Sequence, residues 1–397
     1  MTEPSGAGRP TVMVLGAGEY GRELIPAFQR LGAVVVAADP DPDAPALGVA
    51  DRSATVALDD ADALAALIAA EAPRYVVVQT AAAAAEALIG AAAGGTVEVF
   101  PTPRAARLAL DREGLRRLAA DELGLPTVPF WFAGSVEELA AVAGRAGFPL
   151  VVGPTVAAPG DGRSVLLRRA DIAPAWQRAV AAGRLPQLRV LVESLVEFDH
   201  EVLLPTVRTV GPAGPVLHFG EPIGHCPGED GALTAWQPQP LLPAALEAAR
   251  SVAARIVTSL GGRGVFGVEL LVRGDEVYFA GVRVGPSDAG LITLRSQRLS
   301  QFELHARAVL GLAVDTVMIS PAAAEVHYRP VGADPAAALC VAESDVRLYP
   351  RAGTGEPTAV VLATAPDPAT ARQRARRIST ALTDPGPGAG APEFGSA

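Results

Sequence analysis

Thr11-Val-Met-Val-Leu15 runs directly into Gly16-Ala-Gly-Glu-Tyr-Gly21 near the start of this 397-residue chain. The first five residues predict a buried strand, and the G-x-G-x-x-G spacing that follows predicts a tight turn into a helix. A second apolar strand at 33–38 ends at an acid, Asp39. This order is the opening of a Rossmann-like βαβ unit. The glycines alone do not identify a dinucleotide, because they serve any ligand held at a helix N-terminus.

Strands and helices continue to alternate as far as about residue 112, which predicts a parallel sheet. We expect a Rossmann-like N-terminal domain at 1–112, an α+β lid at 113–190, and a larger α+β domain with a small strand-rich cap at 191–384. Residues 385–397 end in Pro-Glu-Phe-Gly-Ser-Ala, which is typical of a cloning remnant, and we expect this tail to be disordered. The predicted fold class is therefore α/β with an α+β lid.

The charge pattern limits the partners that the chain can have. Its net charge is −10, and its 33 cationic residues, all of them arginine, are spread without a basic run. This disfavours nucleic acid and anionic membranes and leaves a small molecule as the expected partner. Cys226 and Cys340 are far apart, which disfavours a disulfide framework or a zinc site. The first apolar run is only five residues long, so we expect no signal peptide or membrane span and a cytoplasmic location.

Several longer stretches carry a family resemblance. They are Val14–Leu24, Asp111–Ala120, Val192–Glu201, Trp236–Gln239, Gly264–Leu270 and Ser296–Leu312. In these stretches the chain resembles the formate-dependent phosphoribosylglycinamide formyltransferases, which are ATP-grasp enzymes of purine synthesis. The resemblance implies a three-domain ATP-grasp architecture and a homodimer. It also implies activation of formate as formyl phosphate with MgATP, followed by transfer of the formyl group to the amine of glycinamide ribonucleotide.

The resemblance assigns a nucleotide pocket to Arg112, Arg163, Glu193 and Glu201. Where the family has a phosphate-binding lysine before the lid loop, this chain has Gly153, and the loop itself carries an acid, Asp161. An acid close to a triphosphate repels it. Arg163 is only a partial replacement for the lysine, so we expect a residual nucleotide pocket without its catalytic end.

The metal site of the family is also altered. Its first carboxylate corresponds to Glu269, whereas its second falls on Gly281, with Arg283 close by. A guanidinium at that place repels Mg²⁺. We therefore expect no metal and no cofactor, with ATP and Mg²⁺ as the alternative.

The remaining candidates lie on the substrate side. Substrate-binding candidates are Glu19, Tyr20, Thr80 and Arg283, and catalytic candidates are Glu269, His225 and Asp288. Glu19 and Asp288 match family residues that contact glycinamide ribonucleotide, whereas Thr80 replaces a family acid. The C-terminal cations that hold the ribose phosphate in the family have no counterpart in residues 347–358, where Arg351 alone is a poor replacement.

Most of these candidates also have a structural interpretation. An acid such as Glu19 stabilises a helix N-terminus without any ligand, and His225 can serve as a hydrogen-bonding residue of the scaffold. Glu269 in a partly apolar cleft is a candidate general acid or base, with Arg283 holding a substrate carboxylate. The alternative is that Arg283 neutralises Glu269 in an inert cleft.

These losses favour one function over two others. We expect a diverged homologue that has lost ATP- and Mg²⁺-dependent ligation and that binds or transforms a different small polar metabolite in the inherited cleft, in a specialised biosynthetic pathway. The first alternative is an active ATP-dependent formyltransferase or carboxylate-amine ligase, and the second is a non-catalytic pseudoenzyme or scaffold subunit. Turnover of ATP with formate and glycinamide ribonucleotide would distinguish the first alternative from the other two functions. We expect no such turnover.

Overall fold

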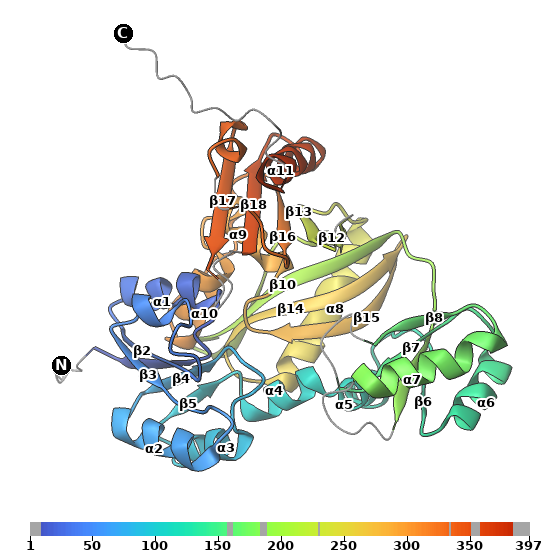
Figure 1. Cartoon of the computed structure of the whole chain (residues 1–397), viewed down its shortest axis with the longest axis horizontal. Coiled ribbons are helices and arrows are strands. Elements are labelled where there is room, and N and C mark those ends of the chain that lie inside the picture. Colours follow the sequence, from blue (N-terminus) through green and yellow to red (C-terminus); the bar gives the residue numbers. More distant parts are fainter. Residues whose placement is uncertain are drawn as a thin grey trace, which may run out of the picture.

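The computed structural model describes residues 9–156, 162–182, 189–228, 231–332, 335–350 and 358–383. It contains three sheets, which Figure 1 shows in the N-terminal part (blue), the lid (green) and the large C-terminal part (yellow to red). The sequence-based statements about Asp161, Arg351 and the tail after residue 383 concern residues outside these ranges. No helix in the described ranges is long and apolar enough to cross a membrane.

The N-terminal sheet is parallel with strand order β3-β2-β1-β4-β5. Its elements are β1 (Thr11–Leu15), α1 (Gly21–Arg30), β2 (Val34–Asp39), β3 (Arg52–Thr55), α2 (Ala61–Glu71), β4 (Tyr75–Val78), α3 (Ala85–Ala93), β5 (Glu98–Phe100) and α4 (Pro103–Leu110). Residues 12–15 of β1 are fully buried, as expected for a central parallel strand covered on both faces. The predicted Rossmann-like unit is confirmed.

The glycine-rich turn is tied to the end of β2. Gly16 has φ +91°, a left-handed conformation that disfavours other residues. The Asp39 carboxylate accepts a hydrogen bond from the Ala17 N–H at 2.7 Å and another from the Asp41 N–H at 3.0 Å. Asp39 therefore holds the turn in place, and this aims the following residues, Glu19 and Tyr20, away from the sheet edge toward the C-terminal part.

The lid has an antiparallel sheet with strand order β6-β9-β7-β8. Its elements are α5 (Arg112–Arg117), η2 (Leu118–Glu122), β6 (Phe130–Ala133), α6 (Val136–Ala146), β7 (Leu150–Pro154), β8 (Ser164–Leu166), α7 (Ile172–Ala182) and β9 (Val190–Ser194). β7 and β8 pair as adjacent antiparallel strands. The expected domain boundary at 190/191 falls inside β9, which pairs with the lid strands β6 and β7, because an apolar strand pattern does not specify its partners. α5 is followed directly by the π-helical turn η2.

The C-terminal part has a nine-stranded sheet of order β15-β14-β10-β12-β13-β16-β18-β17, with β11 paired to β10. Its elements are β10 (His200–Gly211), β11 (Gly214–Phe219), β12 (Ile223–Pro227), β13 (Leu233–Gln237), α8 (Pro243–Leu260), β14 (Gly264–Arg273), β15 (Glu276–Val284), α9 (Thr293–Ser296), α10 (Gln301–Val309), β16 (Ala322–His327), β17 (Ser344–Tyr349), β18 (Thr358–Thr364) and α11 (Pro368–Thr383). The expected strand-rich cap is therefore continuous with the large sheet through the β13–β16 pairing.

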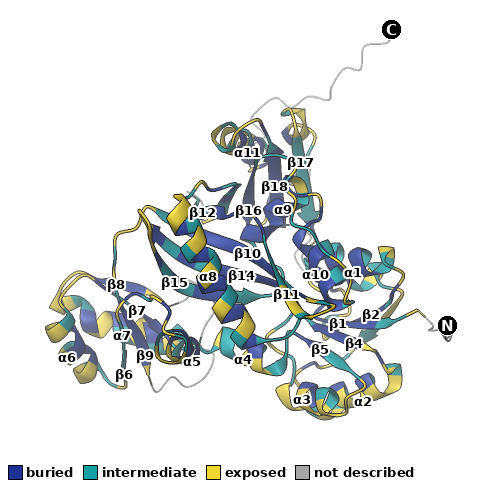
Figure 2. Cartoon of the chain, turned by 180° about the vertical axis from the view of Figure 1, so that it is seen from behind, coloured by how far each residue is buried: buried dark blue, intermediate teal, exposed yellow. Residues whose placement is uncertain are grey.

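One apolar core joins the N-terminal and C-terminal parts. Phe28 of α1 and Phe302 of α10 are both fully buried in it, together with β1 and β16 side chains. The ring of Tyr20 packs edge-on against Phe302, with centroids 5.9 Å apart. The two helices lie side by side beneath the red strands in Figure 1, and Figure 2, seen from behind, shows α10 largely in the dark blue of buried residues. Residues at this seam are therefore rigidly placed.

His305 of α10 is a buried histidine held in its neutral form. Its ring is 2% exposed, its Nδ1 accepts the Val265 N–H at 3.2 Å, and among the described residues its Nε2 has no partner. Gly264 lies against the ring, since a Cβ there would come within 2.9 Å of it. Burial lowers the pKa of His305 to about 4.

This lowered pKa predicts loss of stability in mild acid. The unfolded chain binds a proton at residue 305 below about pH 6.5, whereas the folded chain binds it only below about pH 4. The free energy of unfolding therefore decreases as the pH is lowered from about 6.5 to about 4. His305→Gln keeps an acceptor for Val265 but does not titrate. Urea unfolding at pH 7 and pH 4.5 should show a loss for the parent that exceeds the loss for the variant by about 2–3 kcal/mol. Equal losses would contradict this account.

Candidate functional site

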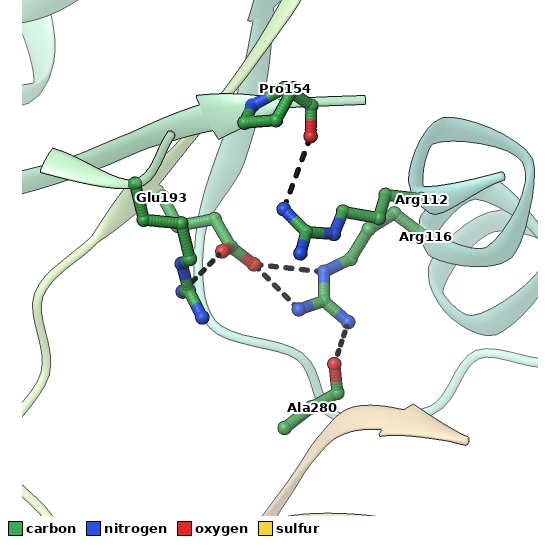
Figure 3. A network of polar contacts seen from close by, with 6 residues as sticks. Arg112, Arg116, Pro154, Glu193 and Ala280 are labelled. Carbon is green, nitrogen blue, oxygen red and sulfur yellow. Dashed lines mark hydrogen bonds and ion pairs between the residues drawn. The ribbon is translucent and has the colours of Figure 1, made fainter. Parts of the chain in front are cut away.

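Arg112, Arg116 and Arg163 lie near the buried carboxylate of Glu193 where the lid meets the large sheet, and Figure 3 shows this network from close by. Arg116 Nε and Nη2 donate to one oxygen of Glu193 at 2.9 and 2.6 Å, and its Nη1 donates to the Ala280 carbonyl at 2.7 Å. Arg163 lies 3.4 Å from the other carboxylate oxygen. Arg112, also from α5, donates to the Pro154 carbonyl at 3.2 Å. The cluster of Arg112, Arg116, Arg163 and Glu193 is called the arginine cluster below.

The arginine cluster carries more positive charge than its carboxylate neutralises. Arg116 and Glu193 are each 7% exposed. Burial lowers the pKa of Arg112, and the neighbouring Arg163 lowers it further, while Glu193 acts in the opposite direction. Guanidinium groups in this arrangement favour a ligand with oxyanions, because planar forks of N–H donors match phosphate and carboxylate oxygens. The cluster is therefore suited to bind a polyanion.

Gly153 lies directly beside these arginines. A Cβ built on it would lie 3.0 Å from Arg163 Cγ and 3.5 Å from Arg112 Nη1. The space that a longer side chain would need at residue 153 is thus occupied by two cationic side chains. Positive charge is present at this end of β7 although residue 153 does not supply it.

A second charged pair lies on adjacent strands of the large sheet. Arg283 Nε on β15 donates to Glu269 Oε1 on β14 at 2.8 Å, and both side chains are partly exposed. Glu269 pairs across the sheet with Gly281, where a Cβ would lie 2.4 Å from Glu269 Oε2. The Glu269 carboxylate therefore fills the space over Gly281. The positive charge of Arg283 acts to lower the pKa of Arg112 in the arginine cluster and that of Tyr328, which lines the cavity described next. The Arg283–Glu269 pair therefore lies within electrostatic reach of both residues.

A cavity of about 260 Å³ lies between the glycine-rich turn and the C-terminal strands. The polar residues of its wall are Glu19, Tyr20, Asp288, His327, Tyr328, Tyr349 and Thr358. The Tyr20 hydroxyl donates to Asp288 Oδ1, and the Tyr328 hydroxyl donates to Asp288 Oδ2 at 2.9 Å. The Thr358 hydroxyl donates to Glu19 Oε1 at 2.7 Å. We call this space the interdomain pocket.

The phenols of the interdomain pocket are held in their protonated form. Burial raises the pKa of Tyr20 well above its ordinary value, and the adjacent Asp288 charge raises it further. The same two causes, in the same order, raise the pKa of Tyr328. A phenol that keeps its proton is a donor, so Asp288 receives a hydrogen bond on each oxygen and remains an acceptor toward the pocket.

The structure brings some of the predicted site residues together and separates others. Arg112, Arg163 and Glu193 meet in the arginine cluster, and Glu19, Tyr20 and Asp288 meet in the interdomain pocket. Thr80 does not line that pocket: it packs against Gly16, and its hydroxyl accepts the Ala82 N–H at 3.1 Å. Glu201 is half-buried at the start of β10. His225 lies on β12 opposite Ala235, with Nε2 buried and unpartnered among the described residues.

Three residues of these sites were missed from the sequence. Arg116 follows Arg112 by one helical turn, and this spacing could have identified it. Tyr328 directly follows the apolar strand β16, where an aromatic residue with a polar tip is a weak signal. Thr358 gives no signal in the sequence, because its contact with Glu19 joins residues 339 positions apart.

Two family models match separate parts of this chain. Residues 10–110 match the ribonucleotide synthetase preATP-grasp domain, and residues 118–302 match the ATP-grasp domain. The chain is 46% identical over 386 residues to the formate-dependent phosphoribosylglycinamide formyltransferase of Rhodococcus jostii (strain RHA1), covering 95% of this chain and 96% of that protein. The chain belongs to the formate-dependent phosphoribosylglycinamide formyltransferase family.

Other members of the family and of the fold agree with this assignment. The enzyme of the same description from Burkholderia mallei (strain SAVP1) is 48% identical over 383 residues, 94% of each chain. A solved structure described as glycinamide-RNase-transformylase T from Mycobacterium tuberculosis has a TM-score of 0.83 at 50% identity, covering 94% of this chain and all of that one. N5-carboxyaminoimidazole ribonucleotide synthetase from Thermus thermophilus, with a TM-score of 0.79 over 94% of this chain and 98% of that one, shares the fold at 24% identity.

The prediction of a degenerate, repurposed chain is wrong. Identities of 46–48% over 94–95% of the chain to formate-dependent family members contradict a diverged form that has lost its activity. The prediction took the missing lysine at Gly153 and the missing carboxylate at Gly281 as loss of the catalytic end. In the structure the side chains of Arg112 and Arg163 lie beside Gly153, and the Glu269 carboxylate lies over Gly281.

The buried Arg116–Glu193 pair should be important for stability. Arg116→Met leaves a buried carboxylate with the half-exposed Arg163 as its remaining ion-pair partner among the described residues, and we expect it to lower the free energy of unfolding by about 3 kcal/mol. Arg117→Met is the matched control, because it breaks an exposed pair with Glu113 and a cation–π contact with Phe132 and should cost about 1 kcal/mol. Urea denaturation at pH 7 measures both. Similar costs for the two variants would contradict a structural role for the buried pair.

Proposed function

We propose that this protein is an ATP-dependent formyltransferase that converts formate and glycinamide ribonucleotide to the formylated product. The observation that carries the proposal is identity of 46–48% to relatives described as formate-dependent phosphoribosylglycinamide formyltransferases, over almost the whole chain. Support also comes from the position of the two sites, one suited to a polyanion and one lined by carboxylate acceptors.

The arginine cluster is the proposed site for the triphosphate of ATP. In the first step a formate oxygen attacks the terminal phosphorus, an O–P bond forms, the bond to ADP breaks, and formyl phosphate results. Arg112 and Arg163 bind the phosphate oxygens and offset the charge that moves onto the leaving ADP. Because the chain contains no lysine, arginine performs the phosphate binding for which the family uses a lysine.

When bound, Mg²⁺ would supply charge neutralisation for this phosphoryl transfer. The described residues contain no group of three or more His, Cys, Asp or Glu side chains that could hold a metal by themselves. Glu269 has the hard oxygen donors that Mg²⁺ prefers, and a site completed by phosphate oxygens and water needs only one or two carboxylates. Glu269 would hold the ion, provided that Arg283 leaves its carboxylate for the nucleotide.

The interdomain pocket is the proposed site for the ribonucleotide amine. In the second step the amine nitrogen attacks the formyl carbon, an N–C bond forms, and the C–O bond to phosphate breaks with the electron pair leaving on phosphate. The nitrogen must lose a proton, and Asp288 is the carboxylate placed to accept it.

Family resemblance further leads us to propose that the protein is a cytoplasmic homodimer. Light scattering of the purified protein tests whether it is a dimer.

Formate-dependent release of ADP tests the proposed function. The purified protein is supplied with ATP, Mg²⁺, formate and glycinamide ribonucleotide, and each component is left out in turn. We expect ADP release at the full rate, together with formylated product, only when all four components are present. No formate-dependent ADP release by a folded protein would overturn the proposal.

Arg163→Met tests whether the arginine cluster binds the nucleotide. Loss of one charge-assisted contact to phosphate should raise the KM for ATP by about tenfold or more. Arg168→Met is the matched control, because Arg168 is largely exposed on the same lid and pairs only with Asp171 among the described acids. Steady-state kinetics with ATP as the varied substrate compares the two. An unchanged KM for ATP in Arg163→Met would place the triphosphate elsewhere.

A further inference from the structure

Every carboxylate in the wall of the interdomain pocket is held by a hydroxyl donor. Asp288 receives one phenol on each of its two oxygens, from Tyr20 and from Tyr328, and Glu19 receives the hydroxyl of Thr358. A carboxylate oxygen has two acceptor positions, so one hydrogen bond on each oxygen orients the group and leaves a position free on each. The pocket therefore presents fixed acceptors and favours a ligand that donates.

The two phenols reach Asp288 from different parts of the chain. Tyr20 follows the glycine-rich turn of the N-terminal part, and its ring packs against Phe302 of α10. Tyr328 follows β16 in the large sheet and is 48% exposed. Asp288 itself lies after β15, at the start of the short helical turn 289–292. The carboxylate is thus fixed from two sides, and its position depends on both domains being in place.

We infer that Tyr20 and Tyr328 are positioning residues that orient Asp288 toward the amino group of the ribonucleotide substrate, and so select a ligand that donates hydrogen bonds at this end of the pocket. This inference rests on the proposed function. The phenols do not touch the reacting atoms. They determine the direction of the free acceptor positions of Asp288, which takes the proton released when the N–C bond forms and the C–O bond to phosphate breaks.

The assignment makes the amine step sensitive to the phenols and leaves the nucleotide step insensitive to them. Without the Tyr328 hydroxyl, Asp288 keeps one phenol and can rotate, which weakens both binding of the amine and proton transfer. The arginine cluster consists of lid residues from α5, from β9 and from the segment before β8, and it includes neither tyrosine. A purely structural role for Tyr328 would instead change all kinetic parameters together or none.

Tyr328→Phe is the direct test, because Tyr328 is half exposed and the change removes only its hydroxyl oxygen. We expect kcat/KM for glycinamide ribonucleotide to fall by about ten- to a hundredfold, while the KM values for ATP and formate stay within about twofold. Tyr20→Phe should act in the same direction, with its melting temperature recorded because Tyr20 lies at the buried seam. Tyr278→Phe is the matched control, since its hydroxyl contacts Glu276 at 3.2 Å on an exposed surface, and it should behave as the parent.

The outcomes separate this inference from the proposed function. If the parent turns over formate and ATP and Tyr328→Phe matches Tyr278→Phe in all parameters, the positioning role is wrong and the proposed function stands. An equal loss for all three substrates in folded Tyr328→Phe would also overturn it. If the parent shows no formate-dependent turnover, the proposed function falls and the inference with it. Calorimetric titration of glycinamide ribonucleotide without ATP gives the same comparison for binding alone.

Discussion

The geometry of the whole site depends on one guanidinium that is removed from water. The Arg116 side chain extends from α5 and is buried between β9 and β15. It contacts Glu193 of β9 and the Ala280 carbonyl of β15 at the same time. A buried charge is tolerated only when its hydrogen bonds are satisfied. Separating the lid from the large sheet would leave the Arg116–Glu193 pair intact within the lid but would remove the Ala280 carbonyl from the buried guanidinium. Arg112, one helical turn earlier on α5, donates to the Pro154 carbonyl at the end of β7, beside the proposed nucleotide site.

The absence of lysine from the sequence shapes the chemistry of this cleft. An ammonium group is a compact charge on a flexible stem, whereas a guanidinium presents a planar set of donors that binds oxyanions and carboxylates in pairs. The arginine cluster uses this property twice, because Arg116 binds the structural Glu193 while Arg112 and Arg163 surround the position of Gly153. A small residue at 153 is thus compatible with a charged site: the volume near its backbone belongs to side chains from α5 and from the segment before β8.

The sequence was sufficient for the fold and insufficient for the fine structure of the site. The βαβ opening could be predicted because periodicity, a glycine turn and a following acid are all local signals. The partner of β9 could not, since pairing depends on contacts between distant segments, and neither could the contact of Thr358 with Glu19. The main error arose from treating motif positions one at a time. Whether a glycine at residue 153 or 281 leaves a gap depends on what neighbouring side chains do, and only the three-dimensional arrangement shows it.

The arginine cluster and the interdomain pocket, which are the proposed nucleotide and amine ends of the site, are built on opposite principles. At the nucleotide end, cations exceed the acid that they surround, so an incoming polyanion gains more than it disturbs. At the amine end, acids are held by uncharged hydroxyls, so their charge is oriented without being cancelled. Arg283 and Glu269 stand between them as a neutral pair whose arginine influences both ends. The pairing of β14 with β15 sets Glu269 opposite Gly281, and because a glycine leaves room there, the carboxylate reaches the guanidinium of Arg283 two residues further along the neighbouring strand. The neutrality of this pair therefore follows from the strand register and from the absence of a side chain at residue 281.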